Sequence, residues 1–184
     1  MRAALLTALV LSIPAASVAV PQRGVLPWTD PRPQARGAAL LRSAMIAGHN
    51  QARRQYGVSP LLWDEGLARD AAVYAARLAR TNRFEHDRQA GRFPRQGENL
   101  FMGTRGAYSY ADMIRLLVDE RRYFRPGRFP NVSRTGSVWH VGHYTQIIWP
   151  SSQRVGCATA SNRSNDYLVC RYLPAGNIVG TVLR

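Results

Sequence analysis

The chain has 184 residues, of which 46% are hydrophobic and 20% charged, and a chain of this size and composition is expected to fold as one globular domain. Its 25 basic residues against 11 acidic ones give a net charge of +14, and all 25 are arginines. The absence of lysine excludes functions that need a lysine amine, such as Schiff-base catalysis and the phosphate-binding P-loop. The positive charge favours anionic partners, such as the surface of a cell envelope.

Residues 1–19 have the pattern of a secretory signal peptide. A basic start at Met1-Arg2 precedes the apolar run Ala3–Ile13, and small residues follow at Ser17-Val18-Ala19, where cleavage would occur. The run is too short to cross a bilayer, and no later stretch reaches membrane length. We therefore expect a secreted or periplasmic protein with no transmembrane segment in the mature chain.

Residues 20–38 are predicted to form an N-terminal linker, and residues 39–184 the folded domain. The linker is rich in proline and has no periodic pattern of apolar residues. From Ala38 onward, apolar residues recur at helical spacing until Gly57, a residue suited to end a helix. The sequence therefore predicts that the domain begins with a long helix.

Two further helices are predicted, each with an N-terminal cap. Asp64 is suited to cap the first, and Ser109 and Asp112 form a capping-box pattern at the start of the second. The apolar stripe of the first consists of Leu67, Ala71, Tyr74, Ala75 and Leu78. The apolar register of the second continues to position 120, where a glutamate stands. Because a buried carboxylate needs a partner, Glu120 is a candidate functional residue, unless the helix end turns it to solvent beside Arg121.

The run Arg121–Phe129 interleaves arginines with aromatic residues, a pattern that proteins binding single-stranded nucleic acid also use. However, it follows an apolar helix directly, so its aromatic residues are better explained as anchors of the core and of a loop. Nucleic acid is therefore disfavoured as a partner.

Beyond Pro130 the pattern changes to that of strands. Tyr144–Trp149 is aromatic and β-branched, which predicts a strand on which His143 and Thr145 face one way and Tyr144 the other. Helices followed by strands predict an α+β arrangement around one sheet.

Residues 154–159 and 166–172 are predicted to form the two arms of a β-hairpin. Pairing the arms symmetrically places Cys157 opposite Cys170, and in an exported protein such a pair is expected to form a disulfide.

Six short motifs occur in an order that resembles the CAP superfamily of cysteine-rich secretory proteins, antigen 5 and pathogenesis-related proteins, whose shared module is the SCP domain. The similarity extends from about Leu41 to Gly180. The motifs are His49-Asn50-x-x-Arg53, Leu62-Trp63-Asp64 with Leu67-Ala68, Gly97-Glu98-Asn99-Leu100, Gly142-His143-Tyr144-Thr145-Gln146-Ile147-Ile148-Trp149, Val155-Gly156-Cys157-Ala158 and Cys170-Arg171-Tyr172-x-Pro174-x-Gly176-Asn177. A single domain with a signal peptide and no lysine resembles the bacterial members.

The resemblance implies a three-layer α–β–α sandwich with a mixed, mainly antiparallel central sheet and a large cleft. It further implies that two histidines and two glutamates line this cleft, at positions His86, Glu98, Glu120 and His143. In the family such histidines can bind Zn2+ or another divalent cation, and nearby carboxylates can orient them or activate water.

The other polar residues of these motifs are expected to support the scaffold. His49 is interpreted as a packing residue between helix and sheet, and Asn50, Arg53 and Asn99 as residues that hold the backbone. His140 is expected at the surface, as an auxiliary ligand at most.

Three functions remain open from the sequence. The preferred one is a secreted binding module without turnover, whose cleft holds a metal and an extended or apolar ligand such as a lipid or a peptide. The second is a metal-assisted hydrolase, with zinc on His86 and His143 and with Glu98 or Glu120 as the base. Against it, the chain lacks the His-Glu-x-x-His pattern of zinc proteases. The third is a protein that binds lipid or an anionic membrane surface.

Overall fold

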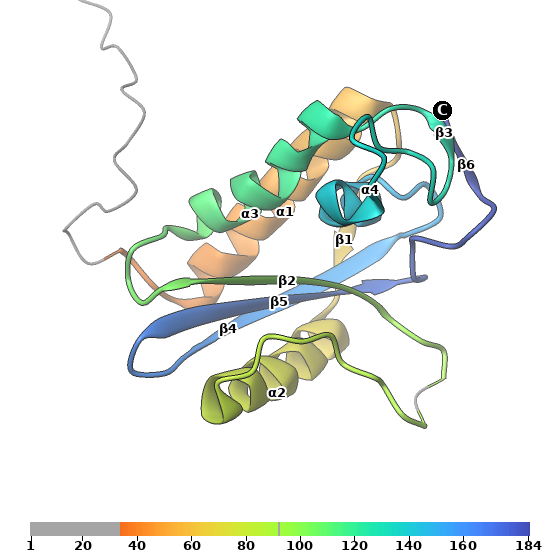
Figure 1. Cartoon of the computed structure of the whole chain (residues 1–184). Helices are drawn as coiled ribbons and strands as arrows, with labels where there is room; N and C mark the ends of the chain where they lie inside the picture. The colour runs from red at the N-terminus through yellow and green to blue at the C-terminus, as the bar shows by residue number, and fades with distance from the viewer. Residues whose placement is uncertain (1–33, 92) are drawn as a thin grey trace, which may run out of the picture.

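The computed structural model describes residues 34–91 and 93–184, which form three layers with a β-sheet between two layers of helices (Figure 1). The predicted signal peptide and residues 20–33 of the predicted linker lie outside the described residues. One face of the sheet carries three helices and the other face carries one, α2. The helices are α1 (Ala38–Tyr56), α2 (Glu65–Thr81), α3 (Tyr110–Val118) and α4 (Gly142–Ile147).

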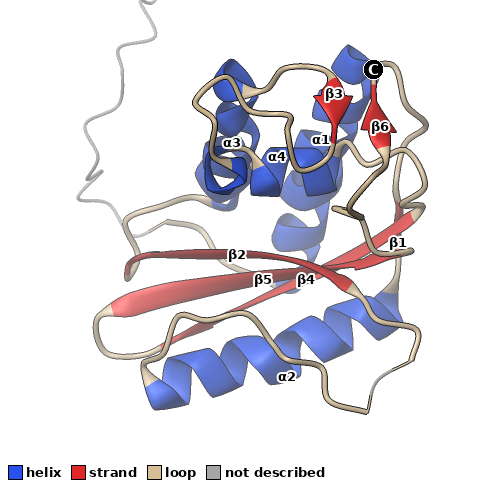
Figure 2. Cartoon of the chain, turned by 45° about the vertical axis from the view of Figure 1, so that its right-hand side comes forward, coloured by secondary structure: helices blue, strands red, loops and turns tan. Residues whose placement is uncertain are grey.

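The central sheet has four strands in the order β1-β4-β5-β2. The short strand β1 pairs with β4 in parallel, whereas the β4–β5 and β5–β2 pairs are antiparallel. A separate two-stranded sheet pairs β3 with β6. Figure 2 shows this small sheet beside α4, on the same side of the central sheet as α1 and α3. The strands are β1 (Leu62–Trp63), β2 (Gly97–Thr104), β3 (Gly127–Arg128), β4 (Arg154–Ser161), β5 (Asn165–Leu173) and β6 (Val182–Leu183). The predicted α+β sandwich with a mixed, mainly antiparallel sheet is confirmed.

Each of the three predicted helices has one end where its predicted capping residue lies. Helix α1 ends at Gly57, which adopts the left-handed conformation (φ 86°) that glycine enters without steric cost. The side chain of Asp64 accepts a hydrogen bond from the N–H of Leu67 at the start of α2. Ser109 and Asp112 form the reciprocal capping box of α3. These local signals therefore predicted the end of α1 and the starts of α2 and α3, whereas α3 ends at Val118, two residues before the predicted register does.

The hydrophobic core has two parts, one on each face of the sheet. The larger part joins the α1, α3 and α4 layer to the sheet and includes Met45, Met113, Ile147 and Trp149. The smaller part lies between α2 and the sheet, and the buried side of α2 is the predicted stripe from Leu67 to Leu78. Within the described residues, no helix is both long enough and apolar enough to span a bilayer.

The prediction of a strand over Tyr144–Trp149 is wrong, because this segment forms helix α4 and the turn that follows it. All six of its residues are buried, so the alternating exposure expected of a strand is absent. A short run that is buried on every side has no hydrophobic period, and β-branched and aromatic residues then favour the wrong prediction. The tertiary environment, rather than local propensity, determines that the segment is helical.

The predicted hairpin is confirmed, with β4 and β5 as its arms and a disulfide between Cys157 and Cys170, which are directly opposite one another.

Replacing both cysteines with alanine is expected to lower the free energy of unfolding by about 3 kcal/mol, because the disulfide closes a short loop in the unfolded chain. Urea unfolding of the variant and of the oxidised wild type measures this difference. Since neither cysteine lines the pocket that holds His86 and His143, any metal affinity is expected to stay within a few-fold. Loss of zinc binding in a folded double variant would contradict this assignment.

Candidate functional site

His86 and Glu98 form the first half of the candidate site. His86 lies in the loop between α2 and β2, and Glu98 is the second residue of β2. Nδ1 of His86 lies 2.6 Å from Oε1 of Glu98, and the same oxygen accepts the backbone N–H of Asp87 at 3.1 Å. The carboxylate is almost fully buried, at 5% exposure, whereas the imidazole is 58% exposed. Glu98 therefore holds one edge of a ring whose other edge is accessible.

His143 and Glu120 form the second half. Glu120 lies in the 3₁₀ turn Asp119–Tyr123 that follows α3, and His143 lies in the first turn of α4. Nδ1 of His143 lies 2.6 Å from Oε1 of Glu120. The second oxygen, Oε2, accepts the backbone N–H groups of His143 at 2.9 Å and Tyr144 at 3.1 Å. A carboxylate in an apolar register needs hydrogen-bond partners, and Glu120 has three. Helix α3 itself ends before Glu120, at Val118.

Both histidines line one pocket of about 380 Å³ at the β2 edge of the sheet, together with Glu98. Glu120 is not among its lining residues and reaches the pocket only through His143. Of the four predicted cleft residues, three therefore face the same pocket and the fourth orients one of them.

The two imidazoles are held in the same way. Because an ionised carboxylate only accepts hydrogen bonds, Nδ1 of each neutral ring carries the proton and Nε2 carries the lone pair. Neither Nε2 has a hydrogen-bond partner in the part of the chain that the structure describes. The arrangement can therefore present two nitrogen lone pairs that are free to bind a ligand.

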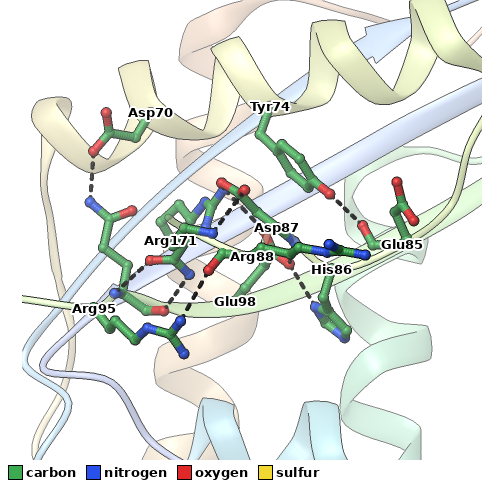
Figure 3. A network of polar contacts seen from close by, with 11 residues as sticks. Asp70, Tyr74, Glu85, His86, Asp87, Arg88, Arg95, Glu98 and Arg171 are labelled. Atoms are coloured by element: carbon green, nitrogen blue, oxygen red, sulfur yellow. Dashed lines mark hydrogen bonds and ion pairs between the residues drawn. The ribbon is translucent and has the colours of Figure 1, made fainter. Parts of the chain in front are cut away.

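A buried arginine, Arg171, supports the first half of the site and was not identified as functional from the sequence. Its side chain is 2% exposed and lies on β5, next to Glu98 on β2. Nη2 donates a hydrogen bond to Oδ2 of Asp87 at 2.7 Å. It also lies 3.1 Å from Oε2 of Glu98, but this contact is an ion pair without the geometry of a hydrogen bond. Figure 3 shows Arg171 between these two carboxylates, with the ring of His86 pointing away from α2.

Helix α2 covers this charged cluster with Tyr74. The guanidinium of Arg171 lies 5.0 Å from the centre of the Tyr74 ring, and burial together with the charges of Glu98 and Asp87 raises the Tyr74 pKa to about 12. Burial opposes the ionisation of Asp87, but hydrogen bonds from Gln89 and Arg171 outweigh it and lower the pKa of Asp87. The cluster therefore places two carboxyl groups beside one buried guanidinium.

The loop that carries His86 is also fixed at both of its ends. The Tyr74 hydroxyl donates to the carbonyl of Glu85 at 2.6 Å. Gln89 exchanges two hydrogen bonds with the backbone of Gln96, and Gln96 donates to Asp70. Although the loop has no regular secondary structure, these contacts attach it to α2.

Of the residues expected to support the scaffold, His49 lies between α1 and the sheet, whereas Asn99 lies on β2 and also lines the pocket. Nδ1 of His49 lies 2.7 Å from the carbonyl of Met45, and Nε2 lies 2.7 Å from the Tyr172 hydroxyl. The Asn99 amide donates to that hydroxyl and to the backbone carbonyl of His143. His49 is fully buried and does not line the pocket.

Three other residues that the sequence singled out lie away from the pocket. Asn50 exchanges two hydrogen bonds with the backbone of Leu61. Arg53 is fully buried and donates only to backbone carbonyls. His140 is exposed and contacts the Thr135 hydroxyl.

The rim of the pocket is apolar and aromatic. Phe84 and Trp139 line it and are 48% and 80% exposed. A tryptophan with so much exposed surface has little role in folding, so it is a candidate for contact with a ligand.

Comparison with known proteins identifies relatives over most of the chain. The model of the family described as "CAP: Cysteine-rich secretory protein family" matches residues 46–172. Pathogenesis-related protein 1B from Nicotiana tabacum is 38% identical over 136 residues, which cover 73% of this chain and 76% of that protein. Pathogenesis-related protein 1 from Arabidopsis thaliana is 38% identical over 133 residues, which cover 72% and 75%.

Solved structures share the fold. The structure titled "Crystal structure of NaASP2 with Zn2+" superposes with a TM-score of 0.65 at 21% identity, covering 79% of this chain and 85% of that one. The structure of BmVAL-1 has a TM-score of 0.65 at 20% identity, with coverage of 82% and 84%. At this level of identity the likeness establishes the three-layer architecture alone.

Proposed function

The chain belongs to the cysteine-rich secretory protein (CAP) family, and on that premise we propose that it is a secreted binding module. Its cleft would hold a divalent cation, with Zn2+ as the first candidate, together with an organic ligand, and it would not turn the ligand over. The observation that carries this proposal is the pair of histidines that share one pocket, each held at Nδ1 by a glutamate.

The histidine–glutamate pairs have the chemistry of zinc ligands with orienting partners. A metal-binding histidine commonly donates its second N–H to a carboxylate, which fixes the tautomer and raises the basicity of the binding nitrogen. Both His86 and His143 meet this condition, and neutral imidazole nitrogen is a good donor to zinc. The relative solved as a complex with Zn2+ supports the same reading.

The donor set also limits the kind of metal site that is proposed. Among the described residues, no group of three or more histidine, cysteine, aspartate or glutamate side chains could hold an ion together. His86 and His143 would therefore fill two positions of a tetrahedral shell, and water or ligand atoms would complete it. When bound, the ion would act as a Lewis acid that attracts an anionic or lone-pair group of the ligand.

The hydrolase alternative has less support from the geometry. A base that activates water needs a carboxylate oxygen free to take a proton. In Glu120 both oxygens accept hydrogen bonds, and in Glu98 one accepts two hydrogen bonds while the other lies buried beside Arg171. We therefore assign both glutamates to orientation of the histidines.

The rim suggests the class of ligand. Trp139 and Phe84 offer apolar surface at the mouth, while the net charge of +14 attracts anions. An amphiphile with an anionic head and an apolar body, such as an envelope lipid, satisfies both features. Export with removal of residues 1–19 is part of the proposal, because it would place the protein where such ligands occur.

Zinc titration of the mature protein tests the proposal. Isothermal calorimetry at neutral pH is expected to show binding in the wild type and none in His86→Ala or His143→Ala, because each variant removes one of two donors. Glu98→Gln and Glu120→Gln are expected to weaken binding by about 10- to 100-fold, since they act through the histidines. Affinity should also fall with acidification, because protons compete for the imidazole nitrogens.

His140→Ala is the matched control, because it removes an exposed histidine that lies outside the pocket. Its zinc isotherm should equal that of the wild type. Unchanged isotherms in both His86→Ala and His143→Ala would show that the histidine pair does not bind the metal.

A further inference from the structure

The sheet has a second edge, on the side opposite the histidine pocket, and most of it has no partner strand. Strand β1 pairs with only two residues of β4, Arg154 and Val155. Beyond them, β4 continues to Ser161 and is paired only with β5 among the described residues. Residues 156–161 of β4 therefore have no partner strand on this side among the described residues, and of these residues 158–161 are partly or fully exposed.

The register of the hairpin shows which backbone groups face this open side. The carbonyl of Val155 accepts the N–H of Asp64, so the backbone groups of Val155 point outward from the hairpin. In an antiparallel pair this orientation repeats every second residue. The N–H and C=O groups of Cys157 and Thr159 therefore point the same way, while those of Ala158 bond to β5. The edge thus presents a regular series of donors and acceptors.

These groups open into a groove of about 580 Å³ between α1 and α2. Cys157 and Thr159 line its floor, and the walls include Trp63, Ala68 and Tyr110. Small residues on α2 leave space beside the strand, and the aromatic residues provide apolar walls. A groove with an open strand as its floor and apolar walls has the features of sites that bind an extended peptide by strand addition.

The charges at the rim indicate what kind of peptide fits. Arg42 is already engaged, because it pairs with Glu65 at 3.0 Å and stacks on the ring of Trp63. Arg69 lines the groove, is exposed and makes no ion pair or side-chain hydrogen bond with the described residues. One uncompensated cation in a chain of net charge +14 favours an acidic partner.

We propose that this groove is a binding site for an extended acidic peptide, which adds beside β4 as an extra strand and pairs an acidic side chain with Arg69. The backbone groups of Thr159 provide the main-chain hydrogen bonds, because Cys157 is buried. The site is separate from the histidine pocket and does not depend on the function proposed for it, because it lies at the other edge of the sheet.

The test uses a fluorescein-labelled, blocked octapeptide of alternating glutamate and valine, and measures its fluorescence anisotropy as the full mature protein is added. Thr159→Pro is expected to weaken binding by about tenfold or more, because it deletes one edge donor. Proline is tolerated at a strand edge whose N–H is free of the ladder, so the fold should persist. Thr159→Val keeps the N–H and is the matched control, with binding within twofold of the wild type.

Further variants separate this site from the histidine pocket and from other occupants. Arg69→Glu is expected to weaken binding by about tenfold, and His86→Ala to leave it unchanged. The same octapeptide with alternate backbone amides N-methylated should not bind. Absence of octapeptide binding at about 1 mM would overturn the proposal. So would dimerisation that Thr159→Pro abolishes, because the edge would then pair with a second copy of the chain.

Discussion

Replacing Arg53 with methionine is expected to lower the free energy of unfolding by about 4 kcal/mol or more. The guanidinium is buried and donates to four backbone carbonyls, those of Ser59, Ile147, Trp149 and Ser152, at 2.6 to 3.0 Å. Burial lowers the pKa of Arg53 to about 10, so the side chain stays charged at neutral pH. Methionine fills similar space but donates no hydrogen bond, so all four carbonyls lose a donor, and three of them belong to buried residues.

The matched control is the adjacent Arg54→Met. Arg54 is exposed, and its guanidinium makes no hydrogen bond with the described residues, so its replacement should change stability by about 0.5 kcal/mol or less. Urea unfolding at pH 7 compares the two variants. Because Arg53 ties α1 to the end of α4, its loss should also disturb His143 and weaken zinc binding. Equal stability of the two variants would refute the role given to Arg53.

Protonation of His49 is expected to make the protein less stable in mild acid. Burial lowers the pKa of His49 from its ordinary value of 6.5 to about 4, and the charge of Arg53 acts in the same direction. Between these two values the unfolded chain binds a proton that the folded protein excludes. The contribution is therefore present above about pH 6.5 and is lost as the pH falls towards 4, to a total of about 3 kcal/mol.

The variant His49→Gln isolates this contribution. Glutamine is neutral throughout the range, whereas all other titrating groups are shared with the wild type. Urea unfolding at several values between pH 7.5 and 4 should give a steeper loss of stability in the wild type, and the difference between the two curves should shrink on acidification. Parallel curves would mean that His49 is protonated equally easily in both states.

The parts of the fold that the sequence predicted are those with local signals. Asp64, Ser109 and Gly57 mark helix ends through their own backbone contacts, and the hairpin follows from two strand patterns of matching length. Helix α4 has no such signal, because its residues are buried on every side and their periodicity is lost. Its identity depends on neighbours such as Arg53 on α1, which are distant in the sequence.

The candidate site, like the fold, was predicted only in part. His86, Glu98 and His143 were predicted from the family resemblance, and they do line one pocket. Arg171 was not predicted as part of the site, although it lies in a quoted motif, because an arginine is normally read as a surface residue. Its burial depends on Asp87 and Glu98, which approach it only in the folded sheet. Spacing along the chain carries no information on such pairs.

Strand β5 separates two groups of polar contacts, one on each face of the sheet. Successive side chains on a strand point to opposite faces, so Arg171 joins the charged cluster under α2, whereas Tyr172 joins the neutral chain of His49 and Asn99 under α1. A substitution at Arg171 would thus remove contacts with Asp87 and Glu98 without removing the hydrogen bond between His49 and Tyr172. One central strand therefore supports both the charged cluster beside the pocket and the packing of α1 on the sheet.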